Sequence, residues 1–548
     1  MIIKSTEAQS RKESARYSLI QLADVNFEKM LEIWDFCQLS FEGETAIKKN
    51  ADKFICRPKS KRKSEKKWQE YLSRGKYPTA DSPAHTLEKM IGILGAKSPD
   101  LTLDGKASSL NFLREYATPF RDGLDALFLR TVEQILRVGR YCFLLEPNDD
   151  DKVGFHINEY RADKFLRAEV TEENGESYAN LVLLDTSNIT FSTKVWRDVY
   201  YPQITLLALD GRGQYYQAKF GGDTAEGSGA VISGYQNGIP QYADAEFLHN
   251  AMGACMAQLE NWNVLDPDPG KCTELIYPTK YGKTLDRIPF TVCNTNSLHL
   301  KKFSNPPLLQ ACLQALHILQ ADCDHQQAIY YTTDPIPVAK GIDQEDELPV
   351  SADQVLYVPV DGDFGFVTTG GTGLAEQRAN LDQMREELRS CGVSLAGTEG
   401  AVNTSGVALE IYRNAQTASL RIINANAGKA IEEQLRFAGK WIGMKPEEIA
   451  ENIRFTPAND FADPKPGVAE LGTLANMAKN YSITAREMRS LAERYLGLEE
   501  RDFDELQAEL DAESEAIETG GFSGMTIPNV VPVKEDEGNT DVEDEPEK

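Results

Sequence analysis

Between residues 304 and 443 the sequence alternates between helical and non-helical patterns in a fixed order, and this order constrains the fold most. Leucines at helical spacing follow the pair Pro306 and Pro307, and proline at the start of a helix costs no backbone hydrogen bond. The pattern predicts a helix over 304–331. The segment 332–372 then carries two strand-like runs, separated by Pro and Gly, which predict a small β insertion.

A second helix is predicted over 373–392, where apolar residues recur on one side. These residues are Leu374, Leu381, Met384 and Leu388. Gly392 is expected to end this helix. A polar, Gly-rich loop over 393–406 follows it.

From Val407 to Trp441 the helical pattern runs without a proline. A helix of about 35 residues would be roughly 50 Å long at 1.5 Å per residue. Such a helix needs support from more than one part of the chain.

On either side of this region the sequence combines helices with β-strands, so we predict the α+β class. Residues 1–303 indicate helices followed by a mixed, mainly antiparallel β domain, with an insertion near 221–272. The strands of this half are expected at 141–146, 179–184, 189–193, 204–210, 215–220 and 289–291. A strand at 453–456 and helices over 464–519 are predicted after the long helix, and the tail 520–548 has the composition of a disordered segment.

The chain has 548 residues, of which 41% are hydrophobic, enough for three or four domain-sized units. Its nine cysteines form no CxxC pair, which favours reduced thiols over disulfides. No apolar run reaches the length of a membrane span, and the N-terminus lacks a signal-peptide pattern. We therefore expect neither secretion nor membrane insertion.

The formal net charge is −27, with 58 basic and 85 acidic residues. This balance disfavours tight binding of nucleic acid along its phosphates, although solubility alone is an equal explanation for it. Residues 57–67 reverse the sign, with seven cations and one acid. They are read either as a solvated loop or as an electrostatic contact with DNA or an acidic neighbour.

Motifs that carry chemistry are missing from the sequence. The Gly-rich segments contain no lysine and so do not form a nucleotide-binding P-loop, and Asp363-Phe364-Gly365 is read as a turn between strands. The closest approach to a metal cluster is Asp322, Cys323, Asp324 and His325, with His317 nearby, but residues adjacent along a helix point apart. We predict no catalytic residue, no metal and no cofactor.

The order of elements, together with local sequence, resembles the portal proteins of tailed double-stranded DNA bacteriophages, especially a type common in prophages and short-tailed phages. The local similarity lies in Phe41–Lys48, in Arg137–Tyr141 with Leu144–Glu146 after it, and in Asn305–Leu309. The resemblance covers about residues 30 to 495.

This resemblance implies a division of the chain. Residues 1–303, with the long helix and return strand at 407–463, would form the wing. The helices 304–331 and 373–392 would form a stem, 332–372 a clip, 393–406 a tunnel loop and 464–519 a crown.

The resemblance also implies roles for particular residues. The tunnel loop would face DNA with Gly397, Thr398, Glu399, Gly400, Asn403, Thr404, Ser405 and Gly406. The clip would present Asp343, Glu345, Asp346, Glu347, Asp361 and Asp363 to docking partners. The stem residues Leu374, Leu381, Met384 and Leu388 would contact a neighbouring subunit, and packing of the same stripe within the protomer is the alternative.

As a portal protein, the chain would form a homo-oligomeric ring, usually of twelve subunits, at one capsid vertex of the virion, after assembly in the host cytoplasm. Double-stranded DNA would pass through it without sequence specificity. The implied protein partners are the terminase large subunit, a head-to-tail adaptor, and the major capsid and scaffolding proteins, with no membrane involved. The competing interpretations are another virion adaptor or scaffold component, and a carboxylate-dependent tail enzyme.

Overall fold

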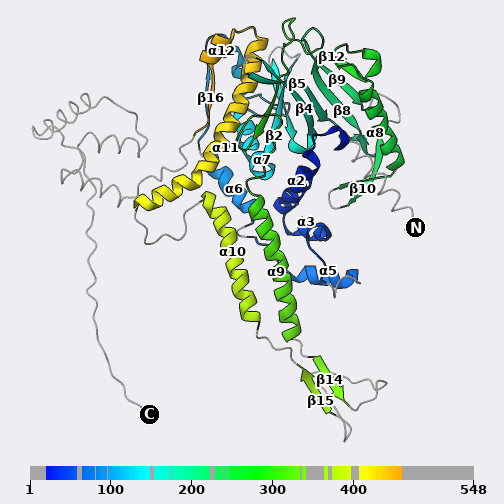
Figure 1. The fold of residues 1–548 in the computed structure, drawn as a ribbon, viewed down its shortest axis with the longest axis vertical. Helices are drawn as coiled ribbons and strands as arrows, with labels where there is room; N and C mark the ends of the chain where they lie inside the picture. The colour runs from blue at the N-terminus through cyan, green and yellow to red at the C-terminus, as the bar shows by residue number, and fades with distance from the viewer. Residues whose placement is uncertain are drawn as a thin grey trace, which may run out of the picture. The chain divides into compact units, whose positions relative to one another are not determined.

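The computed structural model describes residues 20–458, except 59–63, 80–81, 96, 149–153, 174–175, 223–228, 237–238, 244, 334–335, 341–362, 368–372 and 397–405 (Figure 1). The chain divides into the units Met1–Phe461 and Ala462–Lys548, and every described residue belongs to the first. The helices expected over 464–519 and the acidic tail 520–548 lie outside the described residues.

Helices and strands both contribute to the described part of the chain, which confirms the α+β class. Its α-helices are α2 (Phe27–Glu42), α3 (Glu44–Lys49), α4 (Ala51–Phe54), α5 (Glu65–Arg74), α6 (Pro83–Leu94), α7 (Leu124–Val138), α8 (Ala245–Glu260), α9 (Leu309–Thr333), α10 (Leu374–Ala396), α11 (Gly406–Trp441) and α12 (Pro446–Asn452). Short 3₁₀ helices are η1 (Gly105–Arg114), η2 (Ala162–Lys164) and η3 (Pro269–Lys271).

The strands form sheets in which every pairing among the described residues is antiparallel. The five-stranded sheet has the order β12 (Glu274–Ile276), β9 (Tyr215–Gly221), β8 (Gln203–Leu209), β5 (Glu176–Asp185), β4 (Phe165–Glu173). The four-stranded sheet has the order β11 (Ile239–Tyr242), β10 (Ala230–Gln236), β7 (Arg197–Tyr201), β6 (Asn188–Ser192). The remaining sheets are β13 (Phe290–Asn294) with β2 (Arg140–Pro147) and β3 (Phe155–Arg161), β1 (Asp100–Leu103) with β16 (Ile453–Thr456), and β14 (Ile336–Lys340) with β15 (Asp363–Val367).

Helix α7 shows how the apolar spacing sets the core. Its buried residues recur at helical intervals from Leu124 to Val138, and it ends at Gly139, whose left-handed φ of 78° lets its N–H bond to Ile135 O. Helix α7 begins at Leu124. Before it the chain makes a tight turn, in which the N–H groups of Ala117 and Thr118 bond to Asp122 O.

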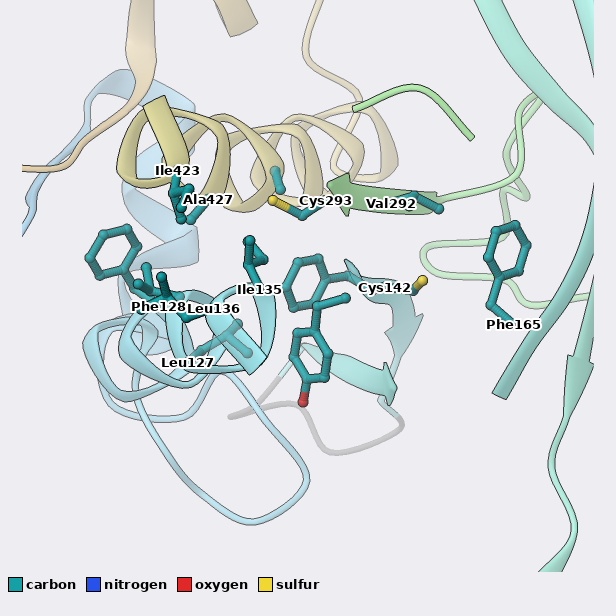
Figure 2. Close-up of a cluster of buried hydrophobic side chains, with 14 of the residues drawn as sticks. Leu127, Phe128, Ile135, Leu136, Cys142, Phe165, Val292, Cys293, Ile423 and Ala427 are labelled. Carbon is teal, nitrogen blue, oxygen red and sulfur yellow. The ribbon is translucent and has the colours of Figure 1, made fainter. Parts of the chain in front are cut away.

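The long helix α11 has 36 residues, which confirms the prediction of one helix over 407–441. Its second half packs on α7 and on the sheet of β2 and β13. Figure 2 shows Ile423 and Ala427 of α11 above Phe128 and Ile135 of α7, with Cys293 of β13 beside them. This long helix therefore belongs to the same hydrophobic core as the N-terminal half of the chain.

Two hydrogen bonds fix the position of α11 along β13 and the residue that follows this strand. Gln434, fully buried, donates through Nε2 to the Thr291 hydroxyl at 2.7 Å. Asn426 donates through Nδ2 to Thr295 O at 3.1 Å. Because a buried polar group without a partner is costly, these pairs disfavour a shift of the helix along the sheet.

After α11 the chain returns to its N-terminal half through β16. Strand β16 matches the predicted strand at 453–456 and pairs with β1, from Asp100 opposite Thr456 to Leu103 opposite Ile453. The sequence did not predict β1.

No described helix has both the length and the apolar content that crossing a lipid bilayer requires.

Gly139 is a position where a single added methyl group should be damaging. An added Cβ would lie 2.7 Å from Ser304 O, and the left-handed φ disfavours any residue with a Cβ. We expect Gly139→Ala to lower the free energy of unfolding by about 2 kcal/mol or more in urea denaturation.

The matched control is Gly92→Ala in α6, where an added Cβ would meet nothing within 4 Å. This change should raise stability by about 0.5–1 kcal/mol, because alanine is the better helix former. Equal effects at the two glycines would contradict the account of the α7 terminus.

Candidate assembly and docking surfaces

The candidate site is built on the helical hairpin, by which we mean α9 and α10. The two helices pack against each other. In the sequence, α9 precedes the paired strands β14 and β15, and α10 follows them. Helix α9 starts at Leu309, just after the prolines, with Leu309 N–H bonded to Pro306 O. Helix α10 continues to Ala396, so the expected end at Gly392 was wrong: an isolated glycine costs a helix only about 1 kcal/mol and does not stop it.

The first half of α9 is embedded in the main hydrophobic core, and the second half is not. Buried side chains occupy both sides of its first turns: Ala311, Cys312, Ala315, Leu316, Ile318, Leu319, Asp322 and Cys323. From Asp324 onward every described side chain of α9 is half-buried or exposed. The base of the hairpin is thus fixed to α2, α6 and α11, while the rest projects beyond the main core.

Residues at the end of α5 hold the middle of α9. Gly75 lies so close to α9 that an added Cβ would be 2.3 Å from Cys323 Sγ. The next residue, Lys76, donates its backbone N–H to Asp322 Oδ2 at 2.8 Å. The buried carboxylate of Asp322 also lies 3.7 Å from Arg385 Nη2 of α10, so this one residue connects three segments.

Two further contacts extend this attachment along α9. Tyr71 donates its hydroxyl to Asp324 Oδ1 at 2.7 Å. Burial, followed by the neighbouring Asp324 carboxylate, raises the pKa of the Tyr71 phenol well above its usual value, so it remains a donor. Arg74 donates to Gln327 Oε1 at 2.9 Å, and its guanidinium stacks 3.8 Å from the Tyr330 ring centre.

The predicted stem residues of α10 divide into two groups. Leu381 and Leu388 are each 2% exposed in the single chain and belong to the main core, whereas Leu374 and Met384 are half-buried. The two buried leucines have no side-chain surface left for a neighbouring subunit. The alternative of packing within the protomer therefore holds for them, because α9, α6 and α11 cover that side of α10.

The outer face of α10 is charged. Arg385 pairs with Asp382 at 3.1 Å, and Arg389 pairs with Glu386 at 3.3 Å. All four side chains are at least 45% exposed, so these pairs contribute little to protomer stability. The outer face of α10 therefore carries both positive and negative side chains.

The predicted clip residues lie mostly outside the described part of the chain. Asp343, Glu345, Asp346, Glu347 and Asp361 lie outside the described residues. Asp363 is the first residue of β15, opposite Lys340 of β14.

The tunnel-loop residues Gly397, Thr398, Glu399, Gly400, Asn403, Thr404 and Ser405 also lie outside the described part. Gly406 is the first residue of α11.

The histidines that came nearest to a metal cluster do not converge with other ligands. His325 Nδ1 lies 3.4 Å from Gln377 Oε1 of α10, and His317 is exposed. Within the described ranges, no group of three His, Cys, Asp or Glu side chains has the geometry to hold a metal ion.

A feature that the sequence did not reveal is the buried cation Arg140 at the start of β2. Its guanidinium lies between the rings of Phe165 and Phe303, 4.5 Å and 4.4 Å from their centres, and donates to Leu300 O. Burial lowers the pKa of Arg140 to about 10. The Arg137–Tyr141 similarity therefore includes a core residue that joins β2 to the segment leading into α9.

Comparisons with known proteins add the following. A family model described as a domain of unknown function (DUF4055) matches residues 307–442, which is the helical hairpin together with α11. Curated proteins give no match.

Among solved structures, the chain is similar to one in the virion of a native gene transfer agent (GTA) particle. The identity is 13%, with 79% of this chain and 93% of that chain covered and a TM-score of 0.36. It is also similar to a chain in the neck of the native GTA particle computed with C12 symmetry, at 11% identity, 74% and 88% coverage and a TM-score of 0.31. A third similarity is to the neck of the empty GTA particle computed with C6 symmetry, at 12% identity, 76% and 89% coverage and a TM-score of 0.32.

The burial of Leu381 and Leu388 predicts that truncating them weakens the protomer itself. We expect Leu381→Ala and Leu388→Ala each to lower the free energy of unfolding by about 2–4 kcal/mol, because each leaves a cavity in the core. Urea denaturation at concentrations where sedimentation shows only protomers measures this directly.

Leu374→Ala is the control, since its half-buried side chain should cost about 1 kcal/mol or less. Loss of oligomers with unchanged protomer stability would instead assign Leu381 and Leu388 to a subunit contact.

Proposed function

We propose that this chain is the subunit of a portal ring at one capsid vertex of a bacteriophage-type virion, through which double-stranded DNA enters and leaves. The observation that carries the proposal is the arrangement of the helical hairpin. Two antiparallel helices flank a small β pair, their base is embedded in the N-terminal half, and a 36-residue helix follows them and returns to the same core.

The helical hairpin is long and firmly attached, as expected for a part of a ring that must resist force along the ring axis. Its helices have 25 and 23 residues, so each is about 35 Å long. Attachment through Asp322, Asp324 and Gln327 holds α9 near its middle rather than only at its base. The charged face of α10 and the half-buried second half of α9 remain for contacts with neighbouring copies, which in a ring are head-to-tail and closed.

The connection between α10 and α11 serves as the tunnel loop in this proposal. Residues 397–405 contain glycine and small polar residues but no lysine or arginine. Each well-made phosphate contact adds a barrier to movement, so a loop without cations suits DNA that must pass in both directions.

The acidic residues of 332–372 serve as the docking surface for partners. Asp343, Glu345, Asp346 and Glu347 fall within five positions, which gives this short segment a strong negative charge. We assign to it the terminase large subunit during packaging and a head-to-tail adaptor afterwards. The major capsid and scaffolding proteins would surround the ring, and the chain itself would carry out no catalysis.

Deleting residues 397–406 tests the proposed function. The ring should still assemble, because the core residues of α9, α10 and α11 are untouched, while DNA packaging or retention should fall at least tenfold. Packaged DNA per particle and ring assembly by electron microscopy are the two readouts.

The matched control replaces residues 397–405 with a Gly/Ser segment of equal length, which keeps the connection between α10 and α11. This variant separates the effect of shortening the chain from the loss of the native side chains. Normal packaging by the deletion variant would contradict the tunnel-loop assignment.

A further inference from the structure

The surface formed by α3, α4 and α5 has the opposite charge to the rest of the chain. Between Glu44 and Lys76 the described residues include eight Lys and Arg against four Asp and Glu, in a protein whose net charge is −27. Of these helices, α5 packs against α9 (Figure 1). Six of the eight cations lie on the three helices themselves, and the count does not include residues 59–63.

Two cations hold this surface together and are already compensated. Arg57 pairs with Asp52 of α4 at 2.5 Å and with Glu65 of α5 at 2.7 Å. Lys48 of α3 pairs with Glu44 and donates to Gly75 O, both at 2.6 Å. These contacts bring the three short helices next to one another and use three of the four acids.

Five lysines on or directly after these helices are left over, and we call them the lysine surface: Lys49, Lys53, Lys66, Lys67 and, two residues after α5, Lys76. Each side chain is exposed, and none forms an ion pair with a described residue. Because their charges are uncompensated, an anion that binds here displaces only water and mobile counterions.

The chemistry of the surface decides which kind of anion fits. Protein interfaces have an apolar centre within a polar rim, and no large apolar side chain is exposed among the described residues from Glu44 to Thr79. Interfaces with nucleic acid are instead polar and strongly positive. A surface of lysines without an apolar centre matches a phosphate backbone better than it matches an acidic protein.

We propose that the lysine surface binds the phosphate backbone of double-stranded DNA without sequence specificity. The negative charge of the remaining chain does not prevent this, because the Debye length is about 10 Å at 0.1 M salt and screens distant acids. Lysines contact phosphates without reading base edges, so affinity should depend on salt and not on sequence. The proposal concerns a surface other than the 397–406 segment and does not depend on the portal role.

The test compares two variants of the full chain that lose the same number of charges. One carries Lys→Gln at the five positions of the lysine surface. The control carries Lys→Gln at five exposed lysines elsewhere, none in an ion pair with a described residue: Lys29, Lys89, Lys271, Lys283 and Lys302. Fluorescence anisotropy with two unrelated labelled 30-base-pair duplexes measures binding between 50 and 200 mM salt.

If five phosphates are contacted, the affinity should fall about 500-fold across this salt range, with a log–log slope near −4.5. The lysine-surface variant should lose nearly all of that slope, while the control variant keeps it and both duplexes bind alike. Equal losses in the two variants, or no binding by the unmodified chain, would overturn the proposal.

Poly-L-glutamate separates the two classes of anionic partner. If it binds the unmodified chain with the same salt dependence and DNA does not, the surface belongs to an acidic protein, and the proposal fails. Ring assembly, imaged for both variants, should be unchanged. Its loss in the lysine-surface variant alone, with DNA binding retained, would assign the lysines to a subunit contact.

Discussion

The structure depends on the burial of the first half of α9 on more than one side. Small residues such as Ala311, Cys312 and Ala315 let neighbouring helices approach it closely, and Leu319 is fully buried among them. With α10 packed along it and α5 attached to its middle, this helix connects the β14–β15 end of the hairpin to the main core. A hairpin attached only at its ends would bend independently of the domain that carries it.

The polar contacts around the hairpin specify position more than they add stability. Asp322 accepts the Lys76 N–H and faces Arg385, so three segments must meet correctly to satisfy one buried carboxylate. Gln434 and Thr291 play the same part for α11. Breaking such a pair leaves a buried polar group unsatisfied, which costs about 1–3 kcal/mol and disfavours alternative registers.

Local pattern was enough to predict the long helix, the two hairpin helices and the return strand. Each depends on regular spacing, and the absence of proline from Val407 to Trp441 left no place for α11 to break. Pairing over long distances was not predictable, and β1 shows why: its four residues form a strand only because β16, about 350 residues later, lies beside it. The sequence also could not show which surface buries Leu381 and Leu388. The spacing of these apolar residues is the same whether a neighbouring subunit or α9 covers them.

The measurement that tests the central claim most directly is electron-microscopic imaging of the purified full-length chain. The account predicts ring-shaped particles of about a dozen subunits with an open centre, because the proposed portal role requires the hairpin and the long helix to repeat around an axis. Compact single protomers at all concentrations, or closed assemblies without a central channel, would contradict it.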